Sequence, residues 1–219
     1  MELRHHGILA FCAAVSIGAC SRSHNAATQP SPQTAASHQT APAAGAQKPG
    51  AGHYPYTEAD VNFMSGMIGH HSQALVMAGW APSHGANPQV RTLCERIING
   101  QQDEIATMQR WLKDRSLPVP DTTMKMDMGS MHHGMLMPGM LTDEQMKDLD
   151  QARGSEFDRK FLTYMIQHHK GAVTMVQQLF ATPGAAQDEA TFKMANDVSA
   201  DQTTEIARMQ TMLQALPAS

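Results

Sequence analysis

Two pairs of adjacent histidines recur 98 residues apart in this chain, His70–His71 and His168–His169, each with a methionine four residues before its second histidine. In a helix, residues three and four apart lie on neighbouring faces, so Met67 and both histidines of the first pair can contact one atom. Imidazole binds copper, and thioether sulfur selects Cu(I). The pattern therefore predicts copper ligands on helices. These candidates are Met67, His70, His71, Met77, Met165, His168, His169 and Met175.

A second group of candidate ligands lies in residues 124–140, "MKMDMGSMHHGMLMPGM", which hold seven methionines and two histidines. Three glycines and a proline interrupt this stretch, unlike a core segment. Thioether sulfur needs no deprotonation to bind a metal, so we predict a site for Cu(I) or Ag(I). A Met-rich docking surface for a partner protein and low-complexity drift are the alternatives. The candidates are Met124, Met126, Met128, Met131, His132, His133, Met135, Met137 and Met140.

Packing explains several of the helical candidates equally simply. Methionine at helical spacing is a common core residue, and a lone buried histidine commonly has only a hydrogen-bonding role. Adjacent histidines diverge by about 100° around a helix, so which one of each pair faces the core stays open. Glu104 and Glu205 are either acceptors for histidine N–H groups or a solvated flank. Cys94, matched by Ala195, is expected to be a small buried residue.

The elements that position these residues are duplicated. Residues 60–78 match residues 158–176 at eight positions with an offset of 98, and residues 101–112 match a second stretch with an offset of 101. The second match includes Gln101 with Gln202 and Glu104 with Glu205. Apolar residues in both copies advance by threes and fours, which is typical of helices. The chain therefore contains an internal duplication of a helical hairpin.

Short connections with turn residues, at 82–88 and 182–187, make the helices of each hairpin antiparallel. Thr57 is a predicted N-cap, and Asp60 and Asp158 are predicted helix-start acids. Thr142 and Gln145 form a predicted capping box for a short helix within residues 141–153. The predicted fold is all-α: a four-helix bundle from two duplicated hairpins, with a short extra helix before the second hairpin.

The N-terminal residues resemble an export signal. Arg4 precedes a short apolar run at residues 8–19, and Cys20 follows. The sequence "IGAC" at 17–20 resembles the lipobox of bacterial lipoproteins, which implies cleavage before Cys20, lipidation of that cysteine and membrane anchoring. An ordinary secretory signal is the alternative. Residues 21–53 contain no Leu, Ile, Val, Met or aromatic residue and are predicted to be a flexible tether.

The predicted organisation is a lipoprotein signal peptide at 1–19, a disordered tether at 20–53, a first helical hairpin at 54–116, a Met/His-rich loop at 117–141, and the short helix with the second hairpin at 142–219. Residues 54–219 form one predicted domain. A net charge of −4 and an aromatic content of 5% argue against a nucleic-acid partner.

The pattern D-x-x-F-x-x-x-M-x-x-H-H-x-x-A-x-x-M, followed by a helix ending in E-I-x-x-M-Q-x-x-L, resembles the bacterial family known as domain of unknown function 305, over about residues 55–216. The resemblance implies a ferritin-like helical bundle exported to the envelope, with a link to copper in some members. It assigns function to the same eight helical positions. The Met-rich insert is not part of the general family pattern.

The favoured hypothesis is a periplasmic, membrane-anchored lipoprotein that sequesters or delivers Cu(I), with Cu(II) or Ag(I) as alternatives, in copper homeostasis or resistance. Its partners are the metal ion, a membrane and another copper-handling protein, and it is not an enzyme. One alternative is a ferritin-like metal-dependent oxidase, although Met67, Ile68, Met165 and Ile166 stand where a di-iron site needs glutamate. The other is a structural or adaptor lipoprotein with a Met-rich docking surface.

Overall fold

The computed structural model describes residues 55–121 and 136–217. Within these residues all regular structure is helical, which confirms the predicted all-α bundle. The helices are α1 (Glu58–Gly79), α2 (Pro88–Asp114), α3 (Asp143–Gln151), α4 (Gly154–Ala181) and α5 (Glu189–Ala215). None of the described helices is long and apolar enough to cross a membrane.

Several predictions concern residues outside the described part of the chain. They are the signal peptide, the tether, Cys20, Met124, Met126, Met128, Met131, His132, His133 and Met135.

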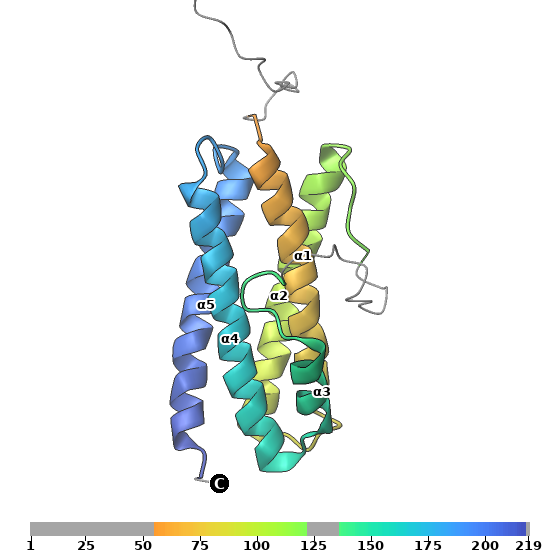
Figure 1. The fold of residues 1–219 in the computed structure, drawn as a ribbon, viewed down its shortest axis with the longest axis vertical. Helices are drawn as coiled ribbons and strands as arrows, with labels where there is room; N and C mark the ends of the chain where they lie inside the picture. Colours follow the sequence, from red (N-terminus) through yellow and green to blue (C-terminus); the bar gives the residue numbers. More distant parts are fainter. Residues whose placement is uncertain (1–54, 122–135, 218–219) are drawn as a thin grey trace, which may run out of the picture. The chain divides into compact units, whose positions relative to one another are not determined.

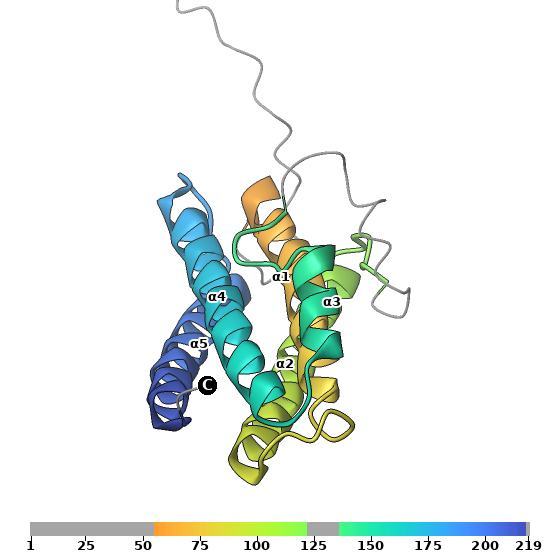
Figure 2. The same cartoon turned by 60° about the horizontal axis from the view of Figure 1, so that its bottom comes forward.

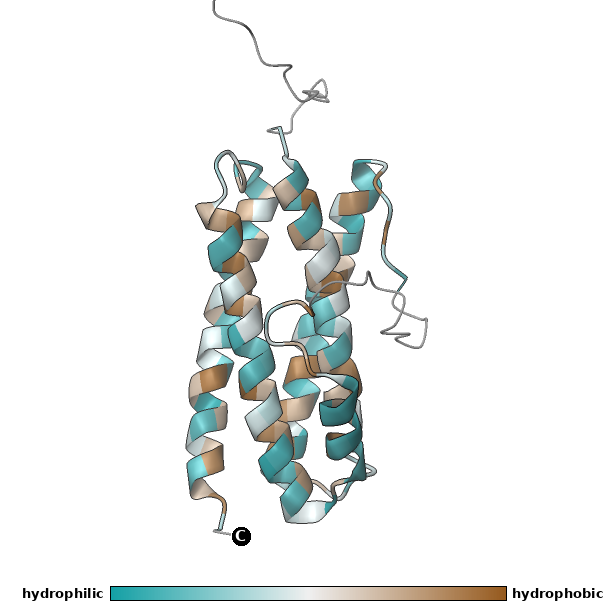
Figure 3. Ribbon diagram, viewed as in Figure 1, coloured by the Kyte–Doolittle hydropathy of each residue, from teal (hydrophilic) through white to brown (hydrophobic). Residues whose placement is uncertain are grey.

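The four long helices form a bundle of two hairpins (Figure 1). Helix α1 packs along α2, helix α4 packs along α5, and the two hairpins meet where α1 contacts α4. Helices α1 and α4 run in opposite directions, so the two copies are related by an approximate twofold axis (Figure 1). Helix α3 contacts α1 and α4 (Figure 2). It is largely hydrophilic and buries Leu149 alone (Figure 3).

The predicted caps of α1 and α3 are confirmed. Thr57 accepts a hydrogen bond from the Asp60 backbone N–H, and the Asp60 carboxylate accepts one from the Thr57 backbone N–H. Thr142 and Gln145 make the same reciprocal pair at the start of α3. A cap of this kind stabilises a helix by about 1 kcal/mol.

Two buried aspartates join the hairpins by holding each other's loops. Asp60 of the first copy accepts a hydrogen bond of 2.6 Å from the backbone N–H of Ala186. Asp158 of the second copy accepts bonds from the backbone and side chain of Asn87, at 3.1 and 2.7 Å. Because α4 begins at Gly154, Asp158 lies in its second turn. The prediction that Asp158 opens its helix is therefore wrong, and its carboxylate anchors a loop instead.

A strap, residues 136–142, crosses α1 and α4 before α3 begins. Met140 N–H donates to the Met137 carbonyl at 3.1 Å, with Pro138 second in the turn and Gly139 third at a φ of +77°. This is the pattern of a type II turn, which favours glycine at its third position. The side chain of Gln73 bonds both the N–H and the carbonyl of Leu141, at 2.8 and 3.0 Å. The strap is therefore fixed to α1 by specific hydrogen bonds.

Helix α4 accommodates the strap because Gly171 has no side chain. A Cβ built on Gly171 would lie 1.9 Å from the Pro138 carbonyl oxygen. Gly171 and Gln73 occupy the same position in the two copies. The duplication has therefore diverged here, since one copy binds the strap and the other makes room for it.

We expect Gly171→Ala to destabilise the protein by about 1–3 kcal/mol, because the added methyl group collides with strap backbone. Gly100→Ala is a matched control in α2, where an added Cβ meets nothing within 4 Å. That control should stabilise the protein by about 0.5–1 kcal/mol, because alanine favours a helix over glycine. Denaturant unfolding of both variants measures these changes, and equal stability of the two would contradict the strap contact.

Candidate metal centre

A layer of buried polar side chains crosses the middle of the bundle. Along α1, an apolar cluster that includes Phe63 to Ile68 ends before His70, and a second cluster begins at Ala74. Along α4 the same two clusters appear in reverse order on either side of His168 and His169. The four paired histidines are all completely buried. Both histidines of each pair therefore face the interior, a point that the sequence left open.

The second histidine of each pair is held by a glutamate of the adjacent helix. His71 Nε2–H donates to Glu104 at 2.8 Å, and His169 Nε2–H donates to Glu205 at 2.6 Å. Both glutamates are mostly buried, with 15% and 17% of their side chains exposed. The sequence left two roles open for these glutamates, and in the structure both act as hydrogen-bond acceptors for histidine. A carboxylate in this position orients the ring and raises its basicity as a ligand.

The first histidine of each pair is held by backbone carbonyls. His70 Nε2–H donates to Pro138 of the strap at 3.0 Å, and His168 Nε2–H donates to the carbonyl of His70 at 3.0 Å. The rings of His70 and His168 lie with their centroids 3.8 Å apart. The two copies of the motif therefore meet directly at the α1–α4 contact.

These acceptors determine the tautomer of every histidine in the layer. Carbonyl and carboxylate oxygens only accept hydrogen bonds, so each Nε2 must carry a proton. In a neutral imidazole the other nitrogen, Nδ1, then presents a lone pair. All four Nδ1 atoms are buried and have no hydrogen-bond partner. Unpartnered buried polar atoms are rare, and four lone pairs at matched positions suit a bound cation.

Burial keeps the imidazoles of His70, His168 and His169 neutral. It lowers the pKa of His70 from 6.5 to about 3, and the neighbouring His71 adds to that shift. Burial lowers the pKa of His168 well below its usual range, followed by the effect of His70. Burial also lowers the pKa of His169, although its bond to Glu205 acts in the opposite direction. Neutral imidazole is the form that binds a metal, so these three rings can bind one without losing a proton.

Two glutamines in the same layer were not predicted as site residues. Gln101 and Gln202 are 3% and 2% exposed, and the amide oxygen of each has no partner. Each lies three residues before the glutamate that holds a histidine. Their signal in the sequence was a polar side chain repeated on an otherwise apolar helix face.

The helical methionines border this layer from both sides. Met67 and Met175 belong to one apolar cluster, and Met77 and Met165 belong to the other. Each cluster thus receives one candidate methionine from each copy. Met140 is buried in the strap, and Met137 of the strap is half-buried.

Cys94 is buried in the cluster that begins at Ala74, as expected, and burial raises the pKa of its thiol to about 12. Among the described residues, no three His, Cys, Asp or Glu side chains converge on one point as metal ligands. A soft-metal site that combines imidazole Nδ1 atoms with thioethers uses a donor set other than three such side chains. The histidine layer supplies the nitrogen donors, and the methionines that border it supply the thioethers.

Without metal, we expect the protein to lose stability as the pH falls from about 6.5 toward about 3. In that range the unfolded chain binds protons that the buried His70 does not, so the unfolded state gains stability. Above about pH 6.5 both states are neutral and this stability is fully present. The loss approaches about 1.4 kcal/mol per pH unit for each such histidine.

Denaturant unfolding in the presence of a chelator, across this pH range, measures the slope. The variant His70→Leu with His168→Leu should show a shallower slope, since carboxylates contribute equally to both proteins. An identical slope in the two proteins would contradict neutral burial of these histidines.

Proteins of known structure share this fold. CopM in its Cu(II)-bound form is 30% identical, and the match covers 71% of this chain and 95% of CopM with a TM-score of 0.56. CopM structures in Cu(I)-bound and Ag-bound forms match with TM-scores of 0.53 and 0.54. A candidate secreted protein of the DUF305 type from Streptomyces coelicolor is 28% identical over 71% of this chain and 92% of its own, with a TM-score of 0.60.

An uncharacterised protein of Acanthamoeba polyphaga mimivirus is 38% identical over 58 residues, which is 26% of this chain. The match spans 38% of the viral protein's length. A family model described as domain of unknown function (DUF305) matches residues 60–213, which include both histidine pairs and nearly all of the four bundle helices. The chain therefore belongs to the DUF305 family.

Proposed function

We propose that this chain is an exported copper-binding protein that sequesters or delivers Cu(I), and that also accepts Cu(II) or Ag(I). The observation that carries the proposal is the set of four buried imidazoles whose Nδ1 atoms have no partner. Leaving such atoms unpaired costs folding free energy, on the order of 1–3 kcal/mol each. A bound cation compensates that cost.

The ligands divide by softness. The Nδ1 atoms of His70, His71, His168 and His169 are borderline donors that suit either copper oxidation state. Met67, Met77, Met165 and Met175 add thioethers, which favour Cu(I) and Ag(I). The Met-rich residues 124–140 supply further soft donors.

The solved relatives support copper as the cargo. CopM has been captured with Cu(II), Cu(I) and Ag. The predicted export signal and the lipobox resemblance at Cys20 favour an envelope location with a lipid anchor. Copper delivered there would pass to another copper-handling protein.

A binding role fits this centre better than catalysis. A di-iron oxidase needs carboxylates directed at the metals. Here the glutamates of the layer, Glu104 and Glu205, each bond a histidine Nε2, so they support ligands. Met67 and Met165 stand three residues before the first histidine of each pair, where a di-iron helix would carry glutamate.

Replacing His70 and His168 together by leucine should weaken copper binding by about tenfold or more, because two of the four lone pairs are removed. Copper titration against a competing chelator measures the affinity, and X-ray absorption counts nitrogen and sulfur neighbours. His84→Gln is the matched control, since His84 is also buried but both its nitrogens have partners in Ser83 and Asp150. Unchanged copper binding in the double variant would overturn the proposed centre.

Replacing Met124, Met126, Met128, Met131 and Met135 by leucine should lower the number of Cu(I) ions bound per chain, because soft donors are lost. Cu(II) binding at the histidine layer should stay unchanged in the same variant. Titration of both oxidation states separates the two effects. Full Cu(I) uptake by this variant would remove the Met-rich stretch from the proposal.

A further inference from the structure

A notch on α1 brings together two thioethers that the chain supplies from distant segments. Gly66 lies in the interior of α1, where glycine costs about 0.5–1 kcal/mol relative to alanine. A Cβ at Gly66 would lie 3.3 Å from the sulfur of Met137 and 3.6 Å from the terminal methyl carbon of Met175. The strap and α4 therefore each place a methionine end over the same bare stretch of backbone.

The second copy of the motif has no such notch. Tyr164 occupies the position that matches Gly66, and its hydroxyl donates to Asp148 of α3 at 2.8 Å. Tyr164 packs against the apolar cluster that begins at Ala74. An aromatic side chain thus fills the space on one side of the bundle, while the strap methionine occupies it on the other.

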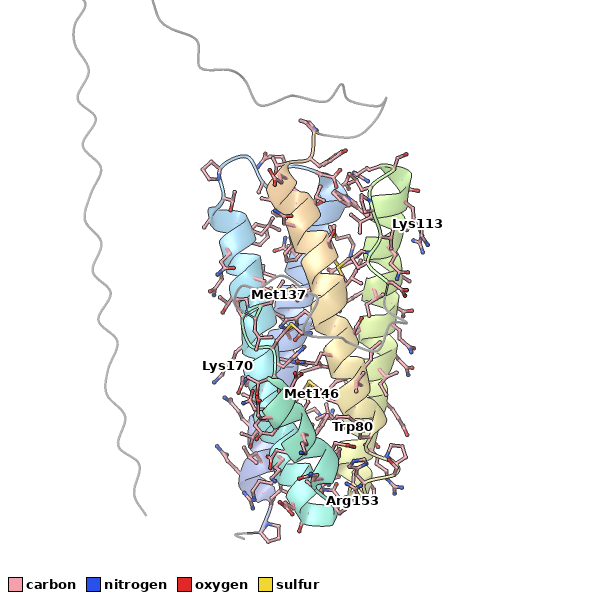
Figure 4. All side chains as sticks on the ribbon, turned by 45° about the vertical axis from the view of Figure 1, so that its right-hand side comes forward. Trp80, Lys113, Met137, Met146, Arg153 and Lys170 are labelled. Carbon is pink, nitrogen blue, oxygen red and sulfur yellow. The ribbon has the colours of Figure 1, made fainter. Side chains whose placement is uncertain are left out.

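The strap holds Met137 in place. Pro138, the next residue, accepts the hydrogen bond from His70, and Gly139 accepts one from Gln167 at 3.4 Å. Figure 4 shows Met137 at mid-height of the bundle, above Met146. The notch therefore lies beside the histidine layer. Met137 directly precedes Pro138, whose carbonyl orients the ring of His70.

The two thioethers differ in burial. Met175 belongs to the apolar core with 9% of its surface exposed, whereas Met137 is half-buried. Met137 is therefore the member of the pair that solvent reaches. Two neutral thioethers form a soft site that favours monovalent Cu(I) or Ag(I) over Cu(II).

We propose that Met137 and Met175 form a two-thioether Cu(I) site over Gly66, separate from the histidine Nδ1 ligands. The inference rests on the proposed function, in that copper is taken as the cargo. It adds a distinct site with one thioether ligand from the strap and one from α4. Gly66 leaves room for this site in the first copy of the duplication, whereas Tyr164 fills the matching position in the second.

The test uses the full mature chain labelled with ¹³C at its methionine methyl groups and titrated with Ag(I), a diamagnetic substitute for Cu(I). The signals of Met137 and Met175 should shift together. The variant Met137→Leu with Met175→Leu should bind about one Ag(I) or Cu(I) fewer per chain. Met146→Leu is the control, because Met146 is also half-buried but packs against the cluster that begins at Ala74, away from Met137.

Cu(II) binding by the single variant Met137→Leu separates this inference from the proposed function, because Met137 is not among the helical ligands of the histidine centre. Loss of one monovalent ion with normal Cu(II) uptake supports the notch site. Normal uptake of all ions, or signals of Met137 and Met175 that do not respond to Ag(I), overturns the notch while the histidine centre stands. Wild-type protein that takes up no copper or silver overturns both.

Discussion

The centre of this bundle depends on four hydrogen bonds made by imidazole Nε2 atoms. Two end on carboxylates, Glu104 and Glu205, and two end on backbone carbonyls. Since every acceptor is an oxygen that cannot donate, all four rings share one tautomer and present a lone pair at Nδ1. Burial lowers the pKa of His70, His168 and His169 and keeps those rings neutral. A polar layer that costs stability in the empty protein is thereby suited to binding a metal.

The duplication supplies the two histidine pairs. The two copies have diverged elsewhere, so each makes a different contact with the strap. Asp60 and Asp158 hold each other's hairpin loops, so the two copies fold as one body. The symmetry is broken at the strap, where Gln73 binds Leu141 and the matching Gly171 gives space to Pro138. Through Pro138 the strap also supplies the acceptor for His70. Only one histidine of the four is therefore held by a segment from outside the four long helices.

Local patterns predicted most of the architecture. The helical period, the caps at Thr57 and Thr142 and the repeated histidine pairs each depend on residues close in sequence. The inward orientation of both histidines in each pair could not be predicted from local patterns. Adjacent residues of a helix point about 100° apart, so both are buried only where partner helices cover the helix on two sides. The unpartnered amide oxygens of Gln101 and Gln202 and the contact of Gly171 with Pro138 arise from tertiary packing, which no single helix encodes.

The most direct measurement is imidazole ¹⁵N NMR of the protein before and after Ag(I) is added. In the apo protein, all four paired histidines should carry the proton on Nε2 and a free lone pair on Nδ1. On loading, the Nδ1 signals should move while Nε2 stays protonated, because the oxygen acceptors remain in place. Binding through Nε2, or Nδ1 signals that do not respond to the metal, would contradict the account.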